Sequence, residues 1–167
     1  MKKALLVIDV QNYFMNSLTK YLPQKILRYI EQNRANFDLI IFTNFVNTPK
    51  SSVYRFLGWK KSITSPEIDI VPELQPALKY GTLISKGVLS ALKVPKVKTL
   101  LKKNKIKKLY LSGIDTDCCV LATAYDAFDQ GYRVYLFKNL SMSHASKNLH
   151  EAAVSMFKRN VGLLTKT

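Results

Sequence analysis

The chain has 167 residues, which suits one domain and is too short for two of ordinary size, so we expect a single domain over residues 1–167. Apolar residues make up 47% and charged residues 22%, a globular composition that excludes a disordered or low-complexity chain. The net charge of +15 raises nucleic acid or an anionic surface as a partner. No apolar run reaches the roughly 18 residues of a membrane span, and the run at residues 4–8 is too short for a signal-peptide core, so we expect a cytoplasmic protein.

Apolar patterns along the chain predict alternating strands and helices. In chain order they indicate a strand at 4–8, a helix at 23–36, a strand at 39–46, a mostly looped region at 48–80, a strand at 82–85, a helix at 96–104, a strand at 108–113, a helix at 117–130 that ends before Gly131, a strand at 133–137, a helix at 146–159 and a strand at 161–164. This alternation predicts an α/β protein with a three-layer Rossmann-like fold and a mostly parallel six-stranded sheet.

Three chemically active residues follow predicted strands, where ligands bind in parallel sheets: Asp9, Lys86 and Cys119. A carboxylate behind five apolar residues is either a structural partner for a turn or a general base. By composition alone Lys86 would be a solvated surface lysine, and its place at a strand end is what distinguishes it. Singly these signals are weak, and together they form a candidate catalytic set.

The two cysteines lie in a strand-to-helix turn at residues 113–120. A thiol in the first turn of a helix is close to unpaired N–H groups and the positive end of the helix dipole, which favour the thiolate. The same N–H groups could stabilise an oxyanion. The alternative is that Cys118 and Cys119 are inert buried side chains, which are common.

Five segments, in order, resemble the motifs of the isochorismatase-like cysteine hydrolases, a family that includes nicotinamidases and N-carbamoylsarcosine amidases. They are D-V-Q-N-Y-F at 9–14, I-V-P-E-L at 70–74, K-G-V-L-S-A-L at 86–92, G-I-D-T-D-C-C-V at 113–120 and H-E-A-A at 150–153. The chain departs from the family pattern at Tyr13, where Asp is usual, and at Leu92, where Phe is usual. The resemblance covers nearly the whole chain.

The resemblance implies a mechanism and assigns its residues. Cys119 is the nucleophile, Asp9 the general base and Lys86 the electrostatic support. The peptide bond Ile114–Asp115 is cis, and the N–H groups of Asp115 and Cys119 form the oxyanion hole. The implied activity is hydrolysis of a C–N bond in a small amide or ureido compound through a Cys119 thioester.

The resemblance also bears on metal content. Metal-binding nicotinamidases carry D-x-H after the second strand, where this chain has Phe45 and Asn47, and no histidine precedes His144. Phe cannot ligate a metal and Asn is a poor substitute for imidazole, so we expect no metal and no cofactor. This counts against a nicotinamidase proper, although a nicotinamidase with an atypical metal site stays an alternative.

Residues in the variable loop are candidates for substrate binding: Phe14, Tyr54, Arg55 and Trp59. An Arg beside aromatic side chains could bind a substrate carboxylate through two hydrogen bonds. The alternative is that the aromatic side chains pack a satellite core. His144 could line the site from the loop after the fifth strand, but we expect a capping or surface role.

Residues 74–114 hold ten lysines and no acidic residue, which suggests a nucleic-acid or anionic-surface binder as a rival interpretation. Eight of these lysines fall in residues 93–108, which lack the interleaved aromatic residues and glycines of an RNA-binding sheet, so a solvated basic face is favoured and nucleic acid is not an expected partner. A family member with a decayed site is a third interpretation, against which the intact catalytic set counts. Relatives commonly form dimers or tetramers, so we expect a homo-oligomer.

Overall fold

The computed structural model describes residues 1–165. Six strands of these residues form one sheet, in the order β3-β2-β1-β4-β5-β6, with every neighbouring pair parallel. The strands are β1 (Lys3–Ile8), β2 (Leu39–Phe45), β3 (Thr82–Lys86), β4 (Lys108–Gly113), β5 (Arg133–Ser141) and β6 (Leu163–Thr165). The predicted α/β class and parallel six-stranded sheet are confirmed.

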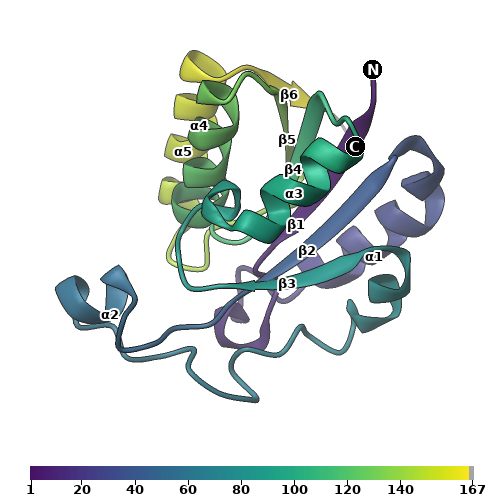
Figure 1. The fold of residues 1–167 in the computed structure, drawn as a ribbon. Helices are drawn as coiled ribbons and strands as arrows, with labels where there is room; N and C mark the ends of the chain where they lie inside the picture. The colour runs from purple at the N-terminus through teal and green to yellow at the C-terminus, as the bar shows by residue number, and fades with distance from the viewer. Residues whose placement is uncertain (166–167) are drawn as a thin grey trace.

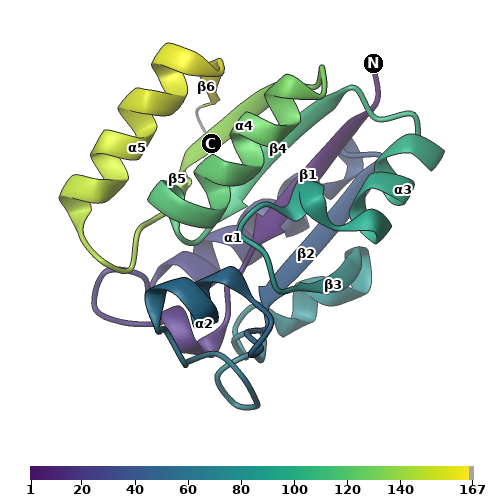
Figure 2. The same cartoon turned by 60° about the vertical axis from the view of Figure 1, so that its left-hand side comes forward.

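Helices cover both faces of this sheet. They are α1 (Leu22–Asn33), α2 (Ser52–Leu57), α3 (Pro95–Lys103), α4 (Leu121–Asp129) and α5 (Lys147–Asn160). Helices α3, α4 and α5 lie on one face and α1 on the other, while the short α2 stands apart near the carboxyl ends of the strands (Figures 1 and 2). No helix within residues 1–165 is long and apolar enough to cross a membrane.

The strand order places a topological switch point between β1 and β4. From β1 the chain winds through α1 to β2 and β3, and then crosses to β4 and continues outward to β5 and β6. Strand β1 is buried on both faces after its first residue, so its sequence is a nearly continuous apolar run, whereas β4 is fully buried only from Leu111 onward. Ligands of such sheets bind beyond the carboxyl ends at the switch point.

The predicted helix at 117–130 differs from the observed structure at its start. A π-helical turn at Thr116–Val120 precedes α4, because the N–H of Val120 reaches back five residues to the carbonyl of Asp115 at 3.0 Å. Such wide turns are rare and often lie at functional sites. The end is as predicted: Gly131 follows with φ of 82° and donates to the carbonyl of Phe128.

Close approach of two strands explains the glycine that ends β4. Gly113 has a φ of 116°, and a Cβ atom there would clash with the backbone oxygen of Ile8 in β1. The glycine therefore lets β1 and β4 stay paired up to their last residues. The chain then leaves both strands at the same level, which brings Asp9 and the cysteine turn together.

Candidate active site

Asp9 lies directly after β1 and is fully buried. Its φ of 52° turns the chain sharply, and its N–H donates to the carbonyl of Thr43 at 3.0 Å. The Thr43 hydroxyl donates in turn to Asp9 Oδ1 at 2.7 Å. The neighbouring strand β2 therefore fixes both the backbone and the carboxylate of Asp9.

Lys86 ends β3 and reaches across β2 to this carboxylate. Its Nζ lies 2.6 Å from Asp9 Oδ2, with both side chains 0% exposed, and it also lies 3.4 Å from the sulfur of Cys119. Nζ donates further to the carbonyls of Val88 and Leu89, each at 3.0 Å. Burial acts against the charged form, but Asp9 and Cys119 raise the pKa of Lys86 above its usual value, so the side chain is an ammonium.

Cys119 lies within the π-helical turn and is 6% exposed. A hydrogen bond with the Cys118 thiol, burial and the charge of Asp9 raise the pKa of Cys119 well above its usual value, and Lys86 acts in the opposite direction. These effects favour the protonated thiol of Cys119 over the thiolate. The structure brings Asp9, Lys86 and Cys119 together around a single ammonium group.

The backbone of the turn determines which N–H groups are available. The peptide bond between Ile114 and Asp115 is cis. The N–H of Thr116 donates to Met142, and the N–H groups of Cys118 and Val120 both donate to the Asp115 carbonyl. Within the part of the chain that the structure describes, no hydrogen bond from the N–H of Asp115 or Cys119 leaves the turn. These are the two groups predicted to form the oxyanion hole.

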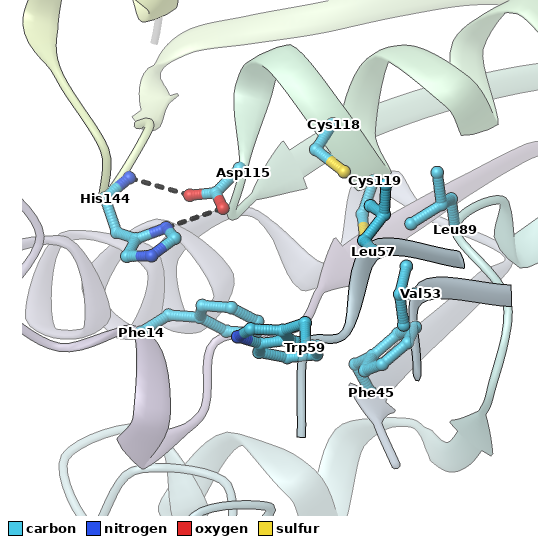
Figure 3. Close-up of a pocket in the computed structure, with 10 residues that line it drawn as sticks. All are labelled: Phe14, Phe45, Val53, Leu57, Trp59, Leu89, Asp115, Cys118, Cys119 and His144. Carbon is cyan, nitrogen blue, oxygen red and sulfur yellow. Dashed lines mark hydrogen bonds and ion pairs between the residues drawn. The ribbon is translucent and has the colours of Figure 1, made fainter. Parts of the chain in front are cut away.

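A cavity of about 160 Å³ opens beside the thiols (Figure 3). Its walls are mostly aromatic and aliphatic, with a few polar groups near the cysteine turn. The lining residues are Phe14, Phe45, Val53, Leu57, Trp59, Leu89, Asp115, Cys118, Cys119 and His144. The two rings of Phe14 and Trp59 are nearly parallel, at 15° with centroids 6.4 Å apart. A cavity with such walls suits a flat, largely apolar small molecule.

Two of the residues predicted to bind substrate do not line this cavity. Helix α2 turns Val53 and Leu57, four residues apart, toward the cavity, so Tyr54 and Arg55 face elsewhere. Tyr54 lies against Lys60, whose Nζ is 5.7 Å from the ring, and Arg55 is exposed. The Arg55 guanidinium instead lies over the Phe56 ring, 5.0 Å from its centroid, and neither residue lines the cavity.

The alternative of a satellite core also fails for part of the loop, because Phe56 is 72% exposed. Trp59 is half-buried and contacts the rings of Tyr13, Phe14 and Phe45. Its indole N–H donates to the Tyr13 hydroxyl at 3.2 Å. Trp59 is therefore part of the cavity wall, together with Phe14.

The expected capping or surface role of His144 is wrong, because this residue lines the cavity. Its Nδ1 lies 2.6 Å from Asp115 Oδ2, and its backbone N–H donates to Asp115 Oδ1 at 2.7 Å (Figure 3). The hydrogen bond with Asp115 raises the pKa of His144, and burial only partly offsets this effect. The other histidine, His150, is buried in α5 and bonds the Thr116 hydroxyl at 2.9 Å.

The residues present do not fit the metal centre that the family resemblance implies for nicotinamidases. The Phe45 ring occupies one expected ligand position, 5.0 Å from the Lys86 ammonium. The Asn47 side chain is held by three hydrogen bonds: its amide group donates to the carbonyls of Trp59 and Lys61, and its oxygen accepts from the N–H of Thr48. Across residues 1–165, no three His, Cys, Asp or Glu side chains are grouped so as to hold a metal ion.

The parallel sheet with a thiol at its switch point defines the class of isochorismatase-like α/β hydrolases. The Isochorismatase domain family matches residues 3–167, so the chain belongs to the isochorismatase family. The chain is 28% identical to Nicotinamidase 3 of Arabidopsis thaliana over 157 residues, which cover 90% of this chain and 78% of that protein. It is thus an isochorismatase-family amidohydrolase, nicotinamidase-like in its sequence.

Solved structures show the same fold. Nicotinamidase PncA from Bacillus subtilis superposes with a TM-score of 0.88 at 24% identity, over 99% of each chain. N-carbamoylsarcosine amidase from Thermoplasma acidophilum gives a TM-score of 0.86 at 23% identity, over 99% of this chain and 96% of that chain. The overall fold is therefore one that these known amidases share.

Proposed function

We propose that the protein hydrolyses a C–N bond of a small amide or ureido compound through a thioester on Cys119. The observation that carries this proposal is the Lys86 ammonium, buried and in contact with both Asp9 and Cys119. A structural ion pair needs no thiol beside it, whereas a base and a cation beside a thiol can activate it as a nucleophile.

In the first half of the reaction, the Cys119 thiol gives its proton to Asp9 as its sulfur attacks the carbonyl carbon. Lys86 stabilises the developing thiolate, which the raised pKa of the resting thiol would otherwise disfavour. The N–H groups of Asp115 and Cys119 receive the carbonyl oxygen as it becomes negative. When the C–N bond breaks, the proton held by Asp9 leaves with the departing nitrogen.

In the second half, water attacks the thioester carbonyl. Asp9 takes a proton from the water, the C–S bond breaks, and the sulfur is protonated again. The products are an amine or ammonia and a carboxylic or carbamic acid. Every step uses groups of the chain and water alone, and the committed hydrogen bonds of Asn47 support a reaction without a metal.

A panel of small amides and ureido compounds tests the proposal. We expect Cys119→Ala to abolish turnover of any substrate found, and we expect a thioester mass on the peptide containing Cys119 after rapid quenching. Cys118→Ala is the matched control, because it removes the adjacent thiol of the same cavity; a loss of at most about tenfold is expected. Full turnover by Cys119→Ala would refute the mechanism.

Metal independence has a separate test. Dialysis against a chelator is expected to leave turnover unchanged, and added zinc is expected not to raise it. If turnover were lost on chelation and restored by zinc, the alternative of a nicotinamidase with an atypical metal site would hold. The single domain, the cytoplasmic location and the homo-oligomer stay predictions.

A further inference from the structure

The cavity contains a polar group that the proposed reaction does not use. His144 lines the wall with an imidazole whose Nδ1 is bound to Asp115, and no hydrogen bond of its Nε2 is found within residues 1–165. Its ring lies edge-on to Phe14 with centroids 5.1 Å apart. The side chain is one-third exposed where it lines the cavity.

The pairing with Asp115 determines what Nε2 can offer. The Asp115 carboxylate accepts hydrogen bonds from both the backbone N–H and Nδ1 of His144, so Nδ1 carries a proton in either charge state. When the ring is charged, Nε2 is an N–H donor; when it is neutral, Nε2 is an acceptor. The carboxylate raises the pKa of His144, which favours the donor form.

From these contacts we infer that His144, held in place by Asp115, is a specificity-determining residue that donates a hydrogen bond from Nε2 to a neutral acceptor on the substrate. The inference rests on the proposed amide hydrolysis, because it assumes that the scissile group lies at Cys119. The substrate class is then a flat, mostly apolar amide with a second acceptor, such as a ring nitrogen or a carbonyl oxygen.

The surrounding charges favour a neutral acceptor over an anionic one. The groups that act on His144 are the carboxylates of Asp115 and Asp117 and the thiol of Cys118. Asp115 already neutralises the imidazolium, and Asp117 adds a further negative charge. A carboxylate on the substrate would meet this negative field, whereas a neutral acceptor still receives the hydrogen bond.

The apolar walls make this one donor decisive. An acceptor buried in the cavity without a partner would lose its bonds to water, and Phe14, Phe45 and Trp59 offer it no replacement there. A site that supplies a hydrogen bond to a buried group discriminates strongly against analogues that lack that group. His144 therefore lets the cavity discriminate between substrates of the same shape that would bind equally well to the aromatic walls alone.

The first test compares two amides of the same shape, nicotinamide with a ring nitrogen and benzamide without one. In the wild-type enzyme we expect kcat/KM to favour nicotinamide by about tenfold to a hundredfold, the usual effect of a hydrogen bond to a charged group. In His144→Phe, which retains a ring against Phe14, this ratio should fall close to one. His144→Gln, which retains an N–H donor, should restore part of it.

The pH dependence of the nicotinamide-to-benzamide ratio of kcat/KM distinguishes a hydrogen-bond donor from a residue with a purely structural role. The wild-type ratio should fall as the pH rises through the pKa of His144, because the neutral ring turns Nε2 into an acceptor. Neither variant ionises at this position, so their ratios should stay flat over the same range. An unchanged ratio in His144→Phe, with both amides turned over, would overturn the inference and leave the Cys119 mechanism standing.

If neither amide is hydrolysed, a binding measurement tests the inferred role of His144. The chain has two histidines, so their imidazole signals can be followed by NMR in Cys119→Ala protein. We expect nicotinamide, and not benzamide, to shift the His144 signal and to leave the buried His150 signal in place. The shift would support the inference even where the proposed hydrolysis fails for these amides. No His144 shift at millimolar nicotinamide would overturn it.

Discussion

Replacement of Lys86 by methionine separates the stabilising and chemical roles of the buried ion pair. Met fills much of the same volume but leaves the Asp9 carboxylate in a fully buried position with one side-chain donor, the Thr43 hydroxyl. The carbonyls of Val88 and Leu89 also lose the ammonium that they accept from. Removal of one partner from a buried pair typically costs about 3–5 kcal/mol, and we expect Lys86→Met to lose stability in this range.

Equilibrium unfolding in urea measures the loss. The matched control is Lys93→Met, which breaks an ion pair with Asp126 at 3.2 Å on the surface, where the Lys93 side chain is 61% exposed. Because solvent screens this pair, we expect its loss to cost less than about 1 kcal/mol. Both variants replace a lysine by methionine, so the difference between their losses of stability measures the effect of burying the ion pair.

A double variant completes the design. Asp9→Asn removes the carboxylate charge and suits the φ of 52°, because Asn tolerates the left-handed region. Asp9→Asn with Lys86→Met should recover at least half of the stability lost in Lys86→Met, since no uncompensated charge is left, and it should stay inactive. Two results would contradict this account of the ion pair. One is a loss of unfolding free energy in Lys86→Met no larger than that in Lys93→Met, and the other is a loss in the double variant equal to the sum of the losses in the single variants.

Three further outcomes are expected. Gly113→Ala should destabilise by at least about 2 kcal/mol in urea unfolding, because the new methyl group meets the Ile8 backbone, whereas Gly131→Ala, with nothing within 4 Å, should cost about 1 kcal/mol for its positive φ alone; equal losses would contradict this account. Burial lowers the pKa of His150, so the unfolded chain binds its proton more readily, and stability from this residue is complete above about pH 6.5 and lost as the pH falls through the lower folded value. His150→Asn should therefore lose less stability than wild type between about pH 7 and pH 5, and parallel losses would exclude this effect. Saturating substrate should protect Cys119 from alkylation by iodoacetamide, as mass spectrometry of the peptide would show, and unaltered modification would argue against its place in the cavity.

The sequence predicts the sheet, and it also predicts that Asp9, Lys86 and Cys119 lie close together, for a physical reason. The carboxyl ends of parallel strands meet at one edge, so residues that follow strands come together however long the connections between them are. Asp9, Lys86 and Cys119 are far apart in the chain, yet each follows a strand whose apolar run is easy to read. The close approach at Gly113 then sets the level at which two of them meet.

The cavity wall is less predictable, because loop paths decide it. Tyr54 and Arg55 have suitable side chains and lie in the expected segment. Helix α2 is only about one and a half turns long, and the residues that it contributes to the cavity wall are Val53 and Leu57. The contact of His144 with Asp115 joins two loops 29 residues apart. An acidic residue in the cysteine turn and a histidine after the fifth strand were visible signals, and only the geometry of both loops pairs them.

The two carbonyl contacts of Lys86 have a mechanical consequence. The ammonium that holds Asp9 and Cys119 also holds the carbonyl of Leu89, whose side chain forms part of the cavity wall. A ligand that shifts the Leu89 backbone would therefore move the ammonium or stretch its hydrogen bond. Under the proposed mechanism, Lys86 thus links the backbone beside the cavity wall to the position of the Cys119 sulfur, so a molecule that distorts this wall should react more slowly as well as bind more weakly.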